Sequence, residues 1–201
     1  MKENYNLKFE EIVNKLEYKP KLLLHSCCAP CSSHVITLLK DFFDITVLYY
    51  NPNIYPKEEY LKRKNEQIRL LEILNVSLLD IDYNYEEFKE ISIGFENEKE
   101  GGIRCNKCFA LRLEKTAFLA AKHNFEYYGT TLTVSPHKNS ENINKIGEII
   151  SNKYNVKFLY SDFKKKEGYK KSIELSKQYE LYRQEYCGCE FSIEREIWKN
   201  Y

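Results

Sequence analysis

Short apolar segments alternate with longer amphipathic segments along most of the chain. The short segments are rich in β-branched and aromatic residues, which predicts strands at residues 21–25, 45–50, 76–81, 125–129 and 156–160. The longer segments have helical periodicity, which predicts helices at residues 32–41, 57–75, 85–95, 105–124 and 139–154. Alternation of this kind is typical of a mostly parallel sheet with flanking helices. We therefore predict an α/β fold.

The pattern changes after residue 160. A Lys-rich loop leads into a polar segment that predicts a helix over residues 172–179, and a closing helix is expected over residues 191–198. We find no repeat or linker in the 201 residues, and 43% of them are hydrophobic, which is enough for one sizeable core. We predict a single α/β domain over residues 1–201, with residues 161–201 as a helical, cysteine-bearing segment packed on it.

Seven cysteines fall into three groups within this pattern. The groups are HSCCAPCS at residues 25–32, RCNKCFALRL at residues 104–113 and YCGCEFS at residues 186–192. The first group follows a predicted strand, and the second opens a predicted helix, where the helix dipole favours thiolate. In open α/β sheets the loops at the carboxyl ends of strands build the site. We expect the three groups to converge on one site.

The compartment decides what these cysteines can do. The start of the chain is charged and amphipathic, unlike a signal peptide, and no stretch approaches the roughly 20 apolar residues that cross a bilayer. We therefore expect a cytoplasmic protein with no membrane partner. In a reducing compartment cysteines persist as thiolates for metals or catalysis, and an odd number resists complete disulfide pairing.

Three chemistries fit cysteines in these positions. Cys105, Cys108, Cys187 and Cys189 could form a four-cysteine zinc site that stabilises a tRNA-binding module. Cys28 and Cys31 are spaced as in thiol-disulfide oxidoreductases. An iron-sulfur site accommodates all seven cysteines, since seven soft ligands exceed what one tetrahedral zinc can use. We favour the iron-sulfur site.

The charge balance excludes a global basic field for nucleic acid, because 31 Lys and Arg residues face 30 Asp and Glu residues. Any RNA contact must therefore be local. The two candidate clusters are Lys164, Lys165 and Lys166 with Lys170 and Lys171, and Lys62, Arg63 and Lys64 with Arg69. Charge runs of this sort are also typical of solvated helix faces.

Five motifs in order give a more specific indication: HSCCAPCS, YNPNIYP, RCxxCFxxRL, TTLTVSPHKN and LYRQEYCGCEFS, from residue 22 to about residue 192. The chain resembles the epoxyqueuosine reductase family of the QueH type. The resemblance implies reduction of epoxyqueuosine to queuosine in the wobble nucleotide of tRNA, with a 4Fe-4S cluster and an adjacent iron ion as cofactors. It also implies a Rossmann-like fold related to nucleotide α-hydrolases. The partners would be the anticodon arm of tRNA and an electron donor that the sequence does not identify.

We expect all seven cysteines to bind metal: Cys27, Cys28, Cys31, Cys105, Cys108, Cys187 and Cys189. For the cluster we assign Cys105 and Cys108, with Cys27 or Cys28 and with Cys187 or Cys189, which leaves Cys31 for the second iron. Catalytic roles are expected for Cys27, Cys31 and Asp162, the last as an oxygen ligand or a proton source. The candidates for binding substrate are Thr130, Thr131, Ser135, His137, Lys138 and Arg183, and Arg183 is the one best suited to a phosphate.

Overall fold

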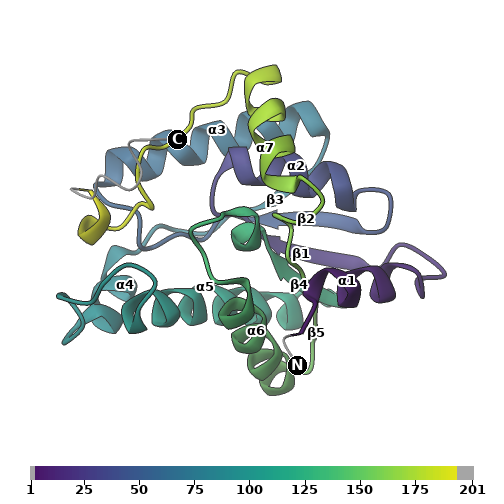
Figure 1. Cartoon of the computed structure of the whole chain (residues 1–201), viewed down its shortest axis with the longest axis horizontal. Helices are drawn as coiled ribbons and strands as arrows, with labels where there is room; N and C mark the ends of the chain where they lie inside the picture. Colours follow the sequence, from purple (N-terminus) through teal and green to yellow (C-terminus); the bar gives the residue numbers. More distant parts are fainter. Residues whose placement is uncertain (1–2, 194–201) are drawn as a thin grey trace.

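Five parallel strands form one sheet in the order β3-β2-β1-β4-β5 (Figure 1). The computed structural model describes residues 3–193. The strands are Lys21–His25 (β1), Asp44–Leu48 (β2), Ser77–Leu79 (β3), Tyr127–Thr130 (β4) and Lys157–Phe158 (β5). The order reverses between β1 and β4, as in doubly wound nucleotide-binding folds. The predicted Rossmann-like α/β fold is therefore confirmed.

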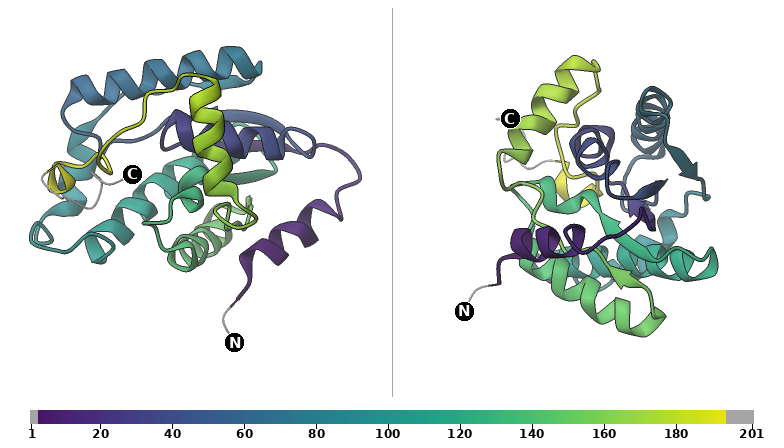
Figure 2. Two further views of the ribbon diagram at one scale, coloured as in Figure 1. Left: turned by 45° about the horizontal axis from the view of Figure 1, so that its top comes forward. Right: turned by 90° about the vertical axis from the view of Figure 1, so that its right-hand side faces the viewer.

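Helices cover both faces of this sheet (Figure 2). The helices are Tyr5–Val13 (α1), Ala29–Leu39 (α2), Lys57–Leu74 (α3), Tyr85–Ser92 (α4), Ile103–Lys122 (α5), Ser140–Tyr154 (α6) and Gly168–Gln178 (α7), with short 3-10 turns at Thr131–Val134 (η1) and Glu190–Ser192 (η2). Side chains of α1, α2 and α3 pack on one face of the sheet, and those of α5 and α6 on the other. Helix α7 lies on α2. None of the helices in residues 3–193 is both long enough and apolar enough to span a membrane.

The central strand β1 joins the two layers of the core. Leu22 and Leu24 face α2 and α3, whereas Leu23 faces α5, because successive side chains of a strand point to opposite faces. All three leucines are fully buried. Each such side chain contributes about 2 kcal/mol when it leaves water. A strand buried on both faces explains the continuous apolar run in the sequence.

Most element boundaries differ from the prediction by a few residues, and one of these differences affects the site. Helix α2 begins at Ala29 rather than at residue 32, because Pro30 fits the first turn of a helix. Cys31 therefore lies on the helix instead of before it. Helix α1 was not among the predicted elements. The predicted helix at residues 191–198 lies largely outside the described residues, which show only η2 in this region.

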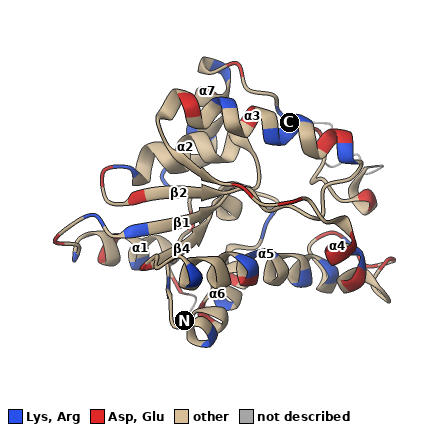
Figure 3. Cartoon of the chain, turned by 180° about the vertical axis from the view of Figure 1, so that it is seen from behind, with Lys and Arg blue, Asp and Glu red and all other residues tan. Residues whose placement is uncertain are grey.

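Lysines and acidic residues are interspersed over the helices (Figure 3). In the predicted basic segment, Lys164 pairs with Asp162 at 2.8 Å, Lys166 with Glu10, and Lys170 with Glu167 at 3.6 Å. Pairing of this kind favours a solvated surface over a nucleic-acid site for this cluster.

Candidate metal centre

The carboxyl ends of β1 and β4 lie side by side, with His25 opposite Thr130. His25 is fully buried between the Thr130 hydroxyl, 2.9 Å from Nδ1, and the Tyr50 carbonyl, 3.0 Å from Nε2. Burial lowers the pKa of His25 to about 3, so this ring stays neutral and structural. Cys27, two residues after β1, and Thr131, directly after β4, meet at the switch point of the sheet, where the Cys27 N–H donates to the Thr131 hydroxyl at 3.1 Å.

Cys27, Cys28 and Cys31, called the cysteine triad here, have sulfurs within 4.8 Å of one another. Side chains from two other segments hold these sulfurs. The Thr131 hydroxyl donates to Cys27 Sγ at 3.3 Å, and Gln184 Nε2 donates to Cys28 Sγ at 3.2 Å. Three soft ligands this close together are suited to one metal ion.

The triad thiols do not ionise independently. Hydrogen bonds from Cys28 and Cys31 hold the pKa of Cys27 well below its usual value. The same contact with Cys27 raises the pKa of Cys28 to about 11, and that of Cys31 lies well above its usual value. Cys27 is therefore the first of the three to lose its proton, and a metal ion that binds all three displaces the remaining protons.

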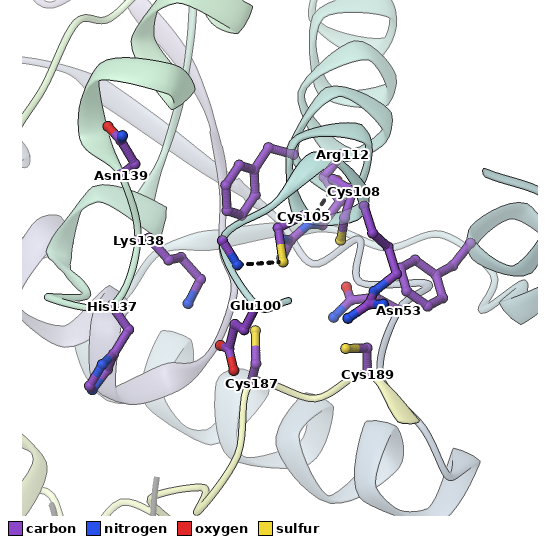
Figure 4. Close-up of a pocket in the computed structure, with 14 residues that line it drawn as sticks. Asn53, Glu100, Cys105, Cys108, Arg112, His137, Lys138, Asn139, Cys187 and Cys189 are labelled. Atoms are coloured by element: carbon purple, nitrogen blue, oxygen red, sulfur yellow. Dashed lines mark hydrogen bonds between the residues drawn. The ribbon is translucent and has the colours of Figure 1, made fainter. Parts of the chain in front are cut away.

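The other four cysteines, Cys105, Cys108, Cys187 and Cys189, are called the cysteine quartet here and line one pocket (Figure 4). Cys105 and Cys108 lie on the first turns of α5, and the other two come from the loop that follows α7. The Gly101 N–H donates to Cys105 Sγ at 3.2 Å. Burial raises the pKa of Cys108 to about 11 and that of Cys189 to about 12.

The quartet depends on how the turn Cys187–Gly188–Cys189 is held. Gly188 has φ +126°, a conformation that L side chains rarely adopt. Its carbonyl accepts from the Tyr55 N–H at 2.8 Å, and the Cys187 carbonyl accepts from Arg63 Nη1 at 3.2 Å. Long-range contacts to α3 and to the loop before it thus bring the last two cysteines to the first turns of α5.

We expect Gly188→Ala to lower the free energy of unfolding by about 1–3 kcal/mol, because the new Cβ adds backbone strain and crowding. The Cβ would lie 3.0 Å from Ile54 Cγ1 and 3.1 Å from Arg63 Nη1. Gly94→Ala is the matched control, since Gly94 also has positive φ but a Cβ there meets nothing within 4 Å. Urea unfolding of both variants checks the prediction, and equal losses would contradict it.

Arg112 places a positive charge beside both cysteine groups. It is 2% exposed, its Nε donates to the Cys108 carbonyl at 3.2 Å and its Nη1 to Asn51 Oδ1 at 3.4 Å. Burial lowers its pKa, but thiolate charge at the cysteines, Cys108 first, outweighs that effect and raises it. No carboxylate within residues 3–193 forms an ion pair with Arg112. A buried arginine needs balancing negative charge, which the sulfurs would supply once a metal holds them as thiolates.

Lys138 is half-buried and lines the quartet pocket. Its side chain extends toward the side of the pocket where Cys187 lies (Figure 4). Burial lowers the pKa of Lys138, but charge at Cys187, Cys27 and Cys31 raises it by more. The quartet and the triad are therefore neighbours that share two cations.

A second pocket, called the side pocket here, opens beside the triad at Cys31. Four of the residues predicted to bind substrate line it: Ser135, His137, Lys138 and Arg183. His137 and Lys138 line both pockets, so the two are adjacent. Arg183 comes from the segment after α7, where its Nη1 donates to Ser176 Oγ at 3.2 Å. Thr131, a fifth predicted residue, is fully buried and contacts Cys27 instead.

Two predicted site residues neither line these pockets nor bond to a cysteine. Thr130 is fully buried, and its hydroxyl is already bonded to His25 and to the Leu132 N–H, so it cannot reach a substrate. Asp162 pairs with Lys164 and lines a separate hollow near Asn4. The loop after β5 turns away from the cysteines at this point. The cysteines lie in a group of three and a group of four, and the ligand set expected for the cluster, which combines members of both groups, stays a prediction.

Sequence reasoning missed the buried polar side chains around the cysteines. Arg112 follows Cys108 by four residues on a helix, a spacing that puts both on one face, so this signal was readable. Arg63 was interpreted as part of a basic surface run, yet it is 2% exposed and pairs with Glu59 at 2.6 Å. Asn51 and Asn53 in the motif YNPNIYP are also buried.

Comparison with known proteins agrees with the resemblance found in the motifs. A family model described as "Epoxyqueuosine reductase QueH" matches residues 22–195. The epoxyqueuosine reductase QueH of Staphylococcus epidermidis is 42% identical over 200 residues, which cover 94% of this chain and 84% of that protein. The corresponding protein of Thermotoga maritima is 37% identical over 175 residues, covering 86% of this chain and 90% of its own length.

Among solved structures, this chain is similar to the U34-tRNA thiolase NcsA from Methanococcus maripaludis, determined with its 4Fe-4S cluster. The TM-score is 0.54, with 10% identity, 94% of this chain covered and 67% of that one. This likeness is one of fold, and it agrees with the expected nucleotide α-hydrolase-like architecture.

Proposed function

We propose that the cysteines of this chain, which belongs to the epoxyqueuosine reductase QueH family, divide between a 4Fe-4S cluster and an adjacent iron ion. Membership of this family makes the protein an oxidoreductase of queuosine synthesis in tRNA. The observation that carries this proposal is the cysteine quartet around one pocket, beside the buried Arg112, which has no carboxylate partner within residues 3–193. Four thiolates are the usual donor set of a 4Fe-4S cluster. Zinc would fit four thiolates equally well, but it has no redox chemistry for a reductase to use.

Cys105 and Cys108 anchor the cluster in this proposal, and Cys187 and Cys189 complete its ligands. Their common pocket supports that set. The alternative is the set expected from the sequence, in which Cys27 or Cys28 joins Cys105, Cys108 and one of Cys187 and Cys189. It is favoured by the low pKa of Cys27 and by its position beside the same cations. Substituting Cys187 and Cys27 separately distinguishes the two sets, since the cluster is lost only when one of its ligands is removed.

The adjacent iron would be held by the cysteine triad. Three sulfurs within 4.8 Å leave coordination positions open for an oxygen of the substrate. The side pocket reaches this point through Cys31, so a nucleotide held there would lie next to the metal.

The reaction removes the epoxide oxygen as water and leaves an alkene, and it consumes two electrons and two protons. When bound, the cluster supplies electrons and the iron acts as a Lewis acid on the oxygen. Lys138 stays protonated between the two cysteine groups, where it stabilises negative charge that develops on the leaving oxygen. Thr131 and Gln184 keep the triad sulfurs in position through their hydrogen bonds.

The substrate side of the proposal is the anticodon arm of tRNA, because the wobble nucleotide lies in its loop. A flipped nucleotide would enter the side pocket, with Arg183 directed at a phosphate and Ser135 and His137 beside the nucleoside. An external electron donor and a cytoplasmic, reducing location complete the proposal.

Metal analysis of anaerobically purified protein tests this function. We expect iron and labile sulfide in at least 4Fe-4S stoichiometry, a brown colour, and conversion of epoxyqueuosine in tRNA when a chemical reductant is supplied. Stoichiometric zinc without sulfide, in protein that still turns over, would contradict the cluster. Metal-free turnover that needs only Cys28 and Cys31 would instead support a dithiol reductase.

A further inference from the structure

Asn53 is a buried amide that lines the quartet pocket. Its side chain is 2% exposed, and its Oδ1 has no hydrogen-bond partner within residues 3–193. Figure 4 shows the amide directed toward the space among the sulfurs. Leaving a buried amide oxygen unpaired costs about 1–3 kcal/mol. Such a group needs an explanation, and a missing ion or cofactor is one of the usual ones.

The neighbouring asparagine shows what a structural amide looks like in this loop. Asn51 accepts from Arg112 at 3.4 Å, and its Nδ2 donates to the Ser26 carbonyl at 2.8 Å. Both ends of the Asn51 side chain are therefore used within the protein. Asn53 lies two residues later in the same turn, which is closed by a hydrogen bond from the Ile54 N–H to the Asn51 carbonyl at 3.1 Å.

The amide of Asn53 is also held in place from the other side. The turn of Cys187 and Cys189 lies next to it, since a Cβ at Gly188 would be in ordinary van der Waals contact with Asn53 Nδ2 at 3.5 Å. The Tyr55 N–H donates to the Gly188 carbonyl at 2.8 Å and joins the two loops. The loop that carries Asn53 is therefore tied to the turn that carries two of the quartet cysteines.

The sulfurs decide which end of the amide faces them. Thiolate and sulfide sulfurs accept hydrogen bonds, and rotating the amide by half a turn exchanges oxygen and nitrogen without changing its shape. Gly101 already donates to Cys105 in the same pocket. We infer that Asn53 donates a hydrogen bond from Nδ2 to a sulfur of the cluster held by the quartet, and that this bond raises the reduction potential of the cluster.

The direction of the change in reduction potential follows from the charge of the cluster. Reduction adds an electron to the cluster, so its sulfurs become more negative and accept a hydrogen bond more strongly. A donor that interacts better with the reduced state favours reduction. This inference rests on the proposed function, since it requires a redox cluster in the quartet pocket.

The test is a redox titration of Asn53→Leu, which keeps the volume of the side chain but removes its N–H donors. We expect unchanged iron and sulfide content and a roughly tenfold smaller equilibrium constant for reduction, which is about 59 mV for one electron. Asn106→Leu is the matched control. Asn106 is next to Cys105, but its side chain accepts a hydrogen bond from Asn142 at 3.2 Å and does not line the pocket. The reduction potential of the cluster in Asn106→Leu should therefore equal that of the wild type.

A second variant tests the same hydrogen bond without changing the shape of the side chain, so that a disturbed fold can be told apart from a lost donor. Asn53→Asp keeps the shape but replaces the donor by a negative oxygen, so it should lower the potential further than leucine does. An intact cluster with an unchanged potential in both variants would overturn the inference, and so would loss of the cluster in both, which would indicate a purely structural role. Wild-type protein without iron and sulfide would overturn the proposed function itself, and this inference with it.

Discussion

Replacing Cys108 by alanine is expected to remove the iron-sulfur cluster and the reductase activity together. Cys108 is 7% exposed and lies one turn after Cys105, and its carbonyl accepts a hydrogen bond from the buried Arg112. Without this thiolate one iron loses its ligand, and the charge of Arg112 loses its nearest balancing group. We expect iron and labile sulfide to fall below cluster stoichiometry and kcat to fall at least about 100-fold, since even residues behind the ligands cost 10–100-fold.

Anaerobic metal analysis and turnover of epoxyqueuosine in tRNA measure both effects. Phe118→Ala is a suitable control, because Phe118 lies on the outer face of the same helix and is 47% exposed. It should keep the cluster and its activity. Iron and labile sulfide at full cluster stoichiometry in Cys108→Ala would show that Cys108 is not a ligand, and would contradict the proposed ligand set.

Local patterns in the sequence were enough to predict most of the fold. Strand β1 was predicted to the residue, because a run buried on both faces is apolar throughout. The start of α2 was predicted three residues late, since Pro30 was interpreted as part of a loop instead of a first helical turn. Strand β5 is only two residues long, and the apolar residues Val156 and Tyr160 on either side of it pack in the core outside the strand.

The metal site was predictable as a set of residues but not as an arrangement. Spacing and position after strands brought all seven cysteines into one expected site. Their grouping depends on contacts between residues far apart in sequence, such as Arg63 with Cys187. The same holds for burial: Arg63 belongs to a run of basic residues that reads as surface, yet its guanidinium is enclosed beside Tyr186 and Glu59. A local pattern carries no information about such partners.

Polar residues outside the cysteine motifs were the least predictable part of the site. Ser135, His137, Lys138 and Arg183 were chosen from two loops and do line one pocket. Asp162 was chosen by the same kind of reasoning, from its position after a strand, but the chain turns toward α1 there and the carboxylate meets Lys164. Position after a strand thus predicts that a residue lies near one edge of the sheet. Whether its side chain reaches the site depends on the direction of the loop, which is set by tertiary packing.

Replacing Cys31 by serine is expected to give the opposite metal phenotype from the Cys108 variant: the cluster stays and the activity is lost. Cys31 is half-buried in the first turn of α2 and lines the side pocket, so serine fits without a cavity. A hydroxyl is a much poorer ligand for iron than a thiolate, and the triad would keep only two soft donors. We expect 4Fe-4S stoichiometry to remain, the additional iron to disappear, and kcat to fall at least about 100-fold.

Mössbauer spectroscopy of iron-57 protein separates the two kinds of iron, and turnover of epoxyqueuosine in tRNA measures the loss of activity. Asp162→Asn provides the control, because that carboxylate lies in a separate hollow and its removal should leave both iron populations and the rate unchanged. Loss of the cluster in Cys31→Ser would indicate that Cys31 is a ligand of the cluster and not of the additional iron. Full activity with both kinds of iron present would mean that the triad does not hold the reacting metal, and that the substrate oxygen must be reduced at the quartet instead.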